Sequence, residues 1–107
     1  MPIVGKISLK ADKDVNAGAE VSLSELFTYD ERRKEFTLES DVERDKTKLK
    51  VTVSKLGVIE TVADTTKKKG DKTNIWLLMK ISDFSKKVKA SESIKKGDIL
   101  DITVESV

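Results

Sequence analysis

Residues 35–54, EFTLESDVERDKTKLKVTVS, contain two consecutive runs in which apolar and polar side chains alternate. The apolar positions are Phe36, Leu38 and Val42 in the first run and Leu49, Val51 and Val53 in the second. A period of two is typical of a strand with one buried face. The polar positions are mainly acidic in the first run, and they include two lysines in the second. An antiparallel hairpin whose paired residue numbers sum to 89 would place Phe36 opposite Val53 and Glu39 opposite Lys50. We therefore predict a hairpin over this stretch.

The same alternation predicts further strands at residues 3–9, 58–63, 75–81 and 100–104. Because both faces of residues 75–81 are apolar, that strand is expected to be central in a sheet or covered on both sides, in a hairpin with residues 58–63.

Two short helices complete the predicted fold. Ser22 and Glu25 have the spacing of a capping box, and a second helix is expected to begin at Ser82 or Asp83. The prediction is a mostly β (α+β) fold, a small antiparallel barrel-like domain of about six strands with two short helices. One domain spans residues 1–107, and no internal repeat is evident.

Composition narrows the functions that remain. The chain has 37% apolar and 37% charged residues, no cysteine and no histidine, which excludes disulfides, Cys/His zinc sites and Ser-His or Cys-His catalysis. The apolar runs are too short to cross a bilayer, and the N-terminus lacks a signal-peptide pattern, so we expect a cytoplasmic protein without membrane contact. Abundant lysine and glutamate are typical of thermophilic proteins. No acidic cluster has the spacing of a metal site, and no cofactor or catalytic residue is predicted.

Charge is distributed unevenly along the chain. Residues 1–45 carry seven basic and eleven acidic side chains, whereas residues 46–107 carry fourteen lysines and eight acidic side chains. Such a field attracts phosphate groups. The candidate contacts are nine lysines in one loop and around the last helix and turn: Lys67, Lys68, Lys69, Lys72, Lys86, Lys87, Lys89, Lys95 and Lys96. A charged loop tip that keeps a β protein soluble explains the first four equally well.

Trp76 and Tyr29 are the candidate stacking residues for a nucleic acid. Trp76 on an apolar strand is also typical of a buried anchor. The leading hypothesis is a non-enzymatic module that binds nucleic acid with weak sequence specificity through its lysines. The alternative is a protein-interaction or structural accessory subunit, for instance a viral one, whose lysines serve solubility. It would bind a protein partner or a second copy through its acidic strand or a free sheet edge.

Overall fold

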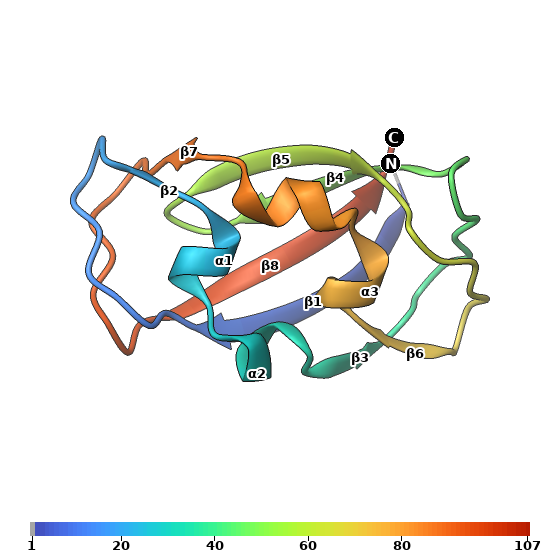
Figure 1. Ribbon diagram of the computed structural model, residues 1–107. Coiled ribbons are helices and arrows are strands. Elements are labelled where there is room, and N and C mark those ends of the chain that lie inside the picture. Colours follow the sequence, from blue (N-terminus) through green and yellow to red (C-terminus); the bar gives the residue numbers. More distant parts are fainter. Residues whose placement is uncertain (1) are drawn as a thin grey trace.

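The computed structural model describes residues 2–107 and is mostly β, with antiparallel sheets and a few short helices (Figure 1). In chain order the elements are β1 (Ile3–Lys10), β2 (Glu20–Val21), α1 (Leu23–Leu26), α2 (Tyr29–Arg32), β3 (Glu35–Thr37), β4 (Lys48–Val53), β5 (Gly57–Val62), β6 (Lys72–Asn74), α3 (Ile75–Leu78), the 3-10 helix η1 (Ile81–Ser85), β7 (Val88–Lys89) and β8 (Ile99–Ser106). Four long strands form a sheet in the order β1-β8-β4-β5, and the short strands form the pairs β2-β7 and β3-β6. The strand pairings within residues 2–107 do not close into a barrel.

The core lies between the four-stranded sheet and the helices, which cover one of its faces (Figure 1). All six apolar residues of the opening stretch, from Phe36 to Val53, are buried, as their alternation predicts. No helix in the described part of the chain is long and apolar enough to cross a membrane.

The hairpin predicted for residues 35–54 is wrong. Phe36 pairs with Thr73 of β6, and β4 pairs with β5 and β8 instead. Lys50 lies opposite Glu60 on one side and Glu105 on the other, so neither cross-strand neighbour is the expected Glu39. The alternation identified buried positions correctly. It could not identify the partner, because more than one strand in this chain offers apolar and acidic side chains in a matching register.

The strand predicted at residues 75–81 is also wrong. Residues 75–78 form helix α3, and the side chain of Asn74 caps it by accepting a hydrogen bond from the Leu77 amide. A short apolar run is compatible with either a strand or a buried helix, and here the N-cap Asn74 favours the helix. The predicted strand at residues 58–63 is present as β5, and its partner is β4.

The first predicted helix is confirmed at its start, since Ser22 and Glu25 form a complete capping box. The second predicted helix is present as the 3-10 helix η1, but the predicted N-cap is wrong: the helix begins at Ile81 after Lys80, and Ser82 and Asp83 lie inside it. The first and last predicted strands are present as β1 and β8, and they pair with each other.

An internal repeat, which the sequence did not reveal, organises the fold. Residues 3–53 and 57–106, hereafter the first and second halves, follow equivalent paths. The bridge between Val15 and Ile94 has a counterpart between Lys67 and Val42, each position moved by 52 residues. The same shift turns the β2-β7 ladder into the β6-β3 ladder.

Individual hydrogen bonds repeat in the same way. Asp12 donates its amide to the carbonyl of Leu26 at 2.8 Å, and Asp64 donates to Leu78 at 2.9 Å. The pairing of β4 and β8 is antiparallel, as a two-fold relation between the halves requires. Every strand ladder joins a strand of the first half to a strand of the second.

Candidate binding surface

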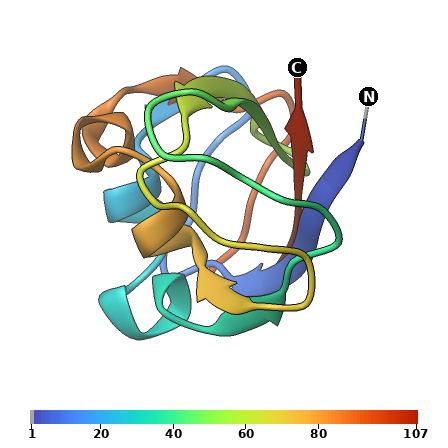
Figure 2. The ribbon, with the colours of Figure 1, turned by 90° about the vertical axis from the view of Figure 1, so that its right-hand side faces the viewer.

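Six of the nine candidate lysines are divided between the two ends of the molecule, which measures 37 × 22 × 20 Å. The loop with Lys67, Lys68, Lys69 and Lys72 lies at the right-hand end of Figure 1, beside residues 38–47. Figure 2 looks onto this end and shows both loops crossing it. The turn with Lys95 and Lys96 lies at the opposite end, beside residues 11–19 (Figure 1). The two lysine groups therefore do not form one continuous surface.

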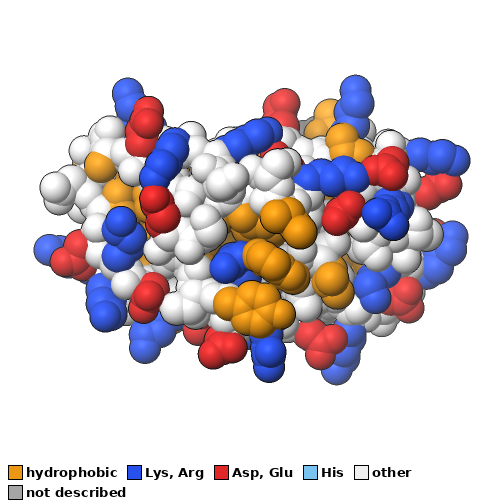
Figure 3. All heavy atoms as spheres, in the orientation of Figure 1, with side chains coloured by type: hydrophobic (Ala, Val, Ile, Leu, Met, Phe, Trp, Pro, Cys, Tyr) orange, Lys and Arg blue, Asp and Glu red, His pale blue; other side chains and the backbone are white. Residues whose placement is uncertain are grey.

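Each lysine loop lies beside an acidic loop of the other half. Residues 38–47 and 63–72 together carry six acidic and six basic side chains. The carboxylate of Asp41 accepts a hydrogen bond from the Lys69 amide at 2.6 Å. At the opposite end, Asp14 accepts one from the Lys96 amide at 2.7 Å. The uneven charge along the sequence is thus largely compensated in space, and acidic and basic side chains alternate at both ends of Figure 3.

The remaining candidate lysines also lie near carboxylates. Lys86 forms an ion pair with Asp83 at 2.7 Å, Lys87 contacts the carboxylate of Glu25, and Lys89 lies opposite Glu20 in the β2-β7 ladder. The hydrogen bond from Lys87, with that from the Ser22 amide, lowers the pKa of Glu25 to about 2. These lysines are exposed, but their charge is shared with acidic neighbours.

Trp76 and Tyr29, the two candidate stacking residues, lie side by side. Trp76 is partly buried and packs against the core, whereas half of Tyr29 is exposed. Their ring centroids are 5.4 Å apart in an edge-to-face arrangement, and the Phe84 ring lies 5.2 Å from Trp76. Both distances are typical of favourable aromatic pairs. The structure thus brings these two residues together, away from the lysine loops at the ends.

Arg32 completes this cluster, although no sequence pattern had indicated it. Its guanidinium lies 4.5 Å from the centroid of Trp76 and 5.3 Å from that of Phe84. Its Nε donates to the carbonyl of Phe27 at 3.3 Å, while Nη1 is buried without a hydrogen-bond partner. Burial lowers the pKa of Arg32, but an arginine remains charged. Within residues 2–107 no carboxylate forms an ion pair with it.

A shallow hollow of about 240 Å³ opens beside this cluster where the helices of the two halves meet. Its wall is formed by Arg32, Trp76, Ile81 and Phe84 together with Ser24, Ser82 and Ser85. The repeat makes Ser24 equivalent to Trp76, and Arg32 equivalent to Phe84, so the hollow straddles the two-fold relation between the halves.

Two exposed apolar side chains belong to the helices α3 and η1, which contribute to the wall of the hollow. Leu77 is 49% exposed and Ile81 is 66% exposed. We call Tyr29, Trp76, Leu77 and Ile81 the apolar surface; Figure 3 shows apolar side chains gathered over α2, α3 and η1. The sequence missed the role of Leu77 and Ile81 because the predicted strand placed both in the core. Arg32 stands in a charged run, DERRK, whose pattern does not distinguish it from Arg33.

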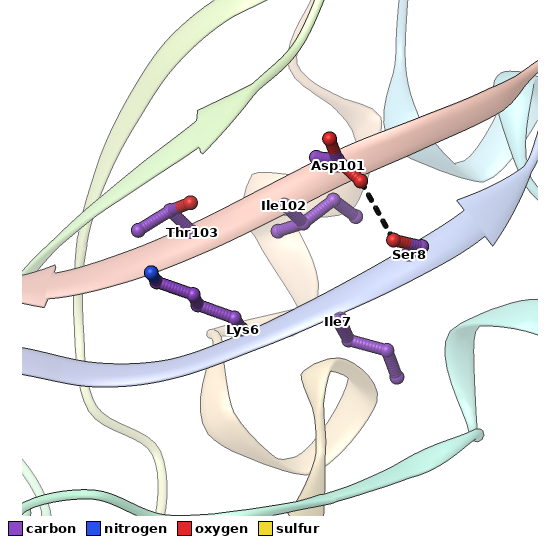
Figure 4. A pocket seen from close by; sticks show the side chains of 6 residues that line it. All are labelled: Lys6, Ile7, Ser8, Asp101, Ile102 and Thr103. Atoms are coloured by element: carbon purple, nitrogen blue, oxygen red, sulfur yellow. Dashed lines mark hydrogen bonds between the residues drawn. The ribbon is translucent and has the colours of Figure 1, made fainter.

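A larger hollow of about 580 Å³ lies over β1 and β8 and is lined by Lys6, Ile7, Ser8, Asp101, Ile102 and Thr103. In Figure 4 Ser8 donates to Asp101, at 2.7 Å, on the solvent side of the two strands. Ser8 and Asp101 are both exposed, and the hollow is open to solvent along the two strands. No group of three or more acidic side chains in the described residues could hold a metal ion.

Comparisons with models of protein families, with curated proteins and with solved structures found no match to this chain.

Proposed function

We propose that this chain is a non-enzymatic binding module whose apolar surface docks a segment of another protein. The observation that carries the proposal is the exposure of Leu77 and Ile81 beside an aromatic-lined hollow. A clustered apolar patch on a small domain marks a docking site more often than scattered apolar residues do. Aromatic side chains with one arginine are also the residues most enriched at the centres of protein interfaces.

Aliphatic side chains favour a protein over a nucleic acid as the partner. Leu77 and Ile81 offer no ring on which a base could stack and no donor for a phosphate. The nearest candidate lysines, Lys86 and Lys87, are engaged by Asp83 and Glu25. The surface thus combines apolar area with little free positive charge, which suits an apolar peptide segment.

Selection from a random peptide library displayed on phage tests the proposal. We expect the enriched peptides to carry large apolar side chains and to lose at least tenfold in affinity for Leu77→Ser and Ile81→Ser. The control is Val58→Ser, because Val58 is 46% exposed on β5, outside the apolar surface. Failure to enrich any peptide, or equal binding to all three variants, would remove the proposal. A mass that doubles with concentration in wild type but not in Ile81→Ser would instead identify a second copy of this chain as the occupant.

Nucleic-acid binding is a second candidate, favoured by the contact between Tyr29 and Trp76 and by the loop of Lys67, Lys68 and Lys69. Stacking on the rings and attraction to the lysines would give weak, salt-sensitive binding. Gel retardation of single- and double-stranded probes at low salt tests it. Retardation that weakens in Trp76→Leu would support this candidate, and no retardation of either probe would eliminate it.

A further inference from the structure

Arg32 is a buried cation without an anion. It is 8% exposed, its Nη1 has no hydrogen-bond partner, and no carboxylate of residues 2–107 forms an ion pair with it. A buried charge of this kind is costly unless it is paired, and most buried polar groups in native proteins have partners. The rings of Trp76 and Phe84 offset part of the cost through their π faces. They leave the hydrogen-bonding capacity of Nη1 unused.

Arg32 also belongs to the wall of the hollow, together with Trp76 and Phe84. A ligand that enters this hollow meets the apolar side chains of Trp76, Ile81 and Phe84, three serines and one positively charged residue. Elsewhere in the molecule, the other arginines are paired at the surface: Arg33 with Asp30 at 3.9 Å, and Arg44 with Asp64 at 3.8 Å. Of the three arginines, Arg32 is therefore the one that is desolvated and forms no ion pair in residues 2–107.

We infer that the hollow receives a carboxylate carried on an apolar chain, and that Arg32 binds it. This inference rests on the proposed function and specifies the docked segment: a protein partner presents an acidic group beside a large apolar side chain. The apolar part packs on Trp76 and Ile81, and the carboxylate faces the guanidinium. The carboxylate can come from an acidic side chain or from a chain terminus.

Charge balance favours a carboxylate over a phosphate. One guanidinium neutralises one carboxylate, whereas a phosphate of two negative charges needs a second cation. Lys86 and Lys87 are the nearest candidates for that second cation, and both already contact carboxylates. An apolar wall would further penalise the more strongly charged group.

N-acetyl-L-phenylalanine and its amide, N-acetyl-L-phenylalaninamide, are matched probes, since they differ only in the carboxylate. Trp76 is the only tryptophan in the chain, so its fluorescence reports on the hollow. We expect the acid to bind about ten- to a hundredfold more tightly than the amide, the range of a hydrogen-bonded ionic contact. Equal binding of the two probes, or no binding of the acid, would overturn the inference. This comparison uses the wild-type protein and needs no variant.

Arg32→Met provides the second measurement. Methionine keeps an unbranched apolar chain against Trp76, and replacing a buried charge by an apolar residue is often tolerated. The preference for the acid should disappear in Arg32→Met and persist in the control Arg33→Met, whose arginine is exposed and paired with Asp30. An acid preference that survives in Arg32→Met would assign the contact to another group and refute the inference.

The source of the carboxylate is tested with capped peptides. Ac-Leu-Phe-OH presents a terminal carboxylate, and Ac-Phe-Asp-Leu-NH₂ presents only a side-chain carboxylate. Binding of either in an Arg32-dependent manner supports the inference and identifies the source. If the library peptides still bind the apolar surface while all acidic probes fail, the proposed function stands and the carboxylate assignment falls. If an oligonucleotide of thymidines displaces the library peptides and the carboxylate probes do not, the ligand is a phosphate.

Discussion

The two halves of this protein follow one backbone path with very different sequences. Under the repeat, Ala11, Asp12, Gly18 and Leu26 have identical counterparts at residues 63, 64, 70 and 78. Around these positions, turns and caps recur with different residues, as in the N-caps Ser22 and Asn74. The path is thus maintained by a small set of buried or backbone-determining positions.

The halves differ clearly in the helix residues in and around the hollow. The first half places Ser24, Glu25, Tyr29 and Arg32 where the second half places Trp76, Leu77, Ile81 and Phe84. Three of the four positions are polar or charged in the first half, at Ser24, Glu25 and Arg32, and all four are apolar in the second. The candidate site therefore arises from divergence between equivalent helix residues, while buried positions such as Leu26 and Leu78 stay the same.

Equivalent core positions should contribute equally. Leu26 and Leu78 are both 0% exposed, so Leu26→Ala and Leu78→Ala should each lower the free energy of unfolding by about 3 kcal/mol in urea denaturation. The control is Leu77→Ala, a neighbour of Leu78 that is 49% exposed and should change stability little. A loss confined to one of the two buried positions would show that the halves are not energetically equivalent.

The equivalent glycines Gly5 and Gly57 should be required for different reasons. A Cβ at Gly5 would lie 2.6 Å from Cδ2 of Phe36, whereas one at Gly57 would meet Val88, the equivalent of Phe36, at 3.5 Å. We expect Gly5→Ala to cost about 2 kcal/mol of stability, because the ring must move. Adding Phe36→Val, the side chain of the second half, should recover part of this loss in the same denaturation assay.

Gly57 has φ +143, a backbone conformation that is strained for any L side chain. Gly57→Ala should therefore destabilise the protein, and Val88→Ala should not rescue it. Rescue of Gly57→Ala by Val88→Ala, or failure of Phe36→Val to rescue Gly5→Ala, would contradict the assignment of steric crowding to the first half and backbone strain to the second.

The helix caps should be worth similar amounts in both halves. Ser22 accepts a hydrogen bond from the Glu25 amide at 3.3 Å, and Asn74 accepts one from the Leu77 amide at 3.0 Å. Ser22→Ala and Asn74→Ala should each cost about 1 kcal/mol, measured by thermal unfolding. Ser22→Asn, which installs the cap of the second half, should retain most of the stability; a loss as large as that of Ser22→Ala would argue against interchangeable caps.

Acid sensitivity should distinguish the halves at one helix position. The pKa of Glu25 is lowered to about 2, so its contribution to stability is present above pH 4.5 and is lost as the pH falls toward 2. The equivalent Leu77 does not titrate. The difference in Tm between wild type and Glu25→Gln should be small at pH 7, because the pair with Lys87 is exposed, and should vanish near pH 2. A Tm difference between wild type and Glu25→Gln that stays constant from pH 7 to pH 2 would contradict this prediction. Asp30→Asn is the control for the change in net charge.

Local features of the fold were predictable from the sequence, and long-range ones were not. The first and last strands, the capping box at Ser22 and the burial of Phe36 through Val53 follow from periodicity and turn chemistry. Strand partners do not, because alternation gives the buried face of a strand but not its neighbour. The charge match that favoured Glu39 with Lys50 is equally satisfied by Glu60 and Glu105.

The candidate site was predictable only in part. Trp76 and Tyr29 were selected as aromatic candidates, and the structure brings them together. Arg32 could not have been chosen over Arg33, since its burial depends on residues more than forty positions away. Helix α3 could have been predicted from Asn74, because Asn is a favoured N-cap residue. A helix beginning there would have placed Leu77 at the surface.

Because every strand ladder joins the two halves, we expect the halves to unfold together and not one after the other. Neither half forms a sheet by itself, so the unfolding of one half removes hydrogen-bond partners from the other. Amide exchange from β1, β4, β5 and β8 should therefore report a single opening event. A backbone cut at residues 54–56, where the chain passes from one half to the other, would leave two fragments still joined by their shared ladders. The connecting turn serves chiefly to keep the two partners at a high effective concentration.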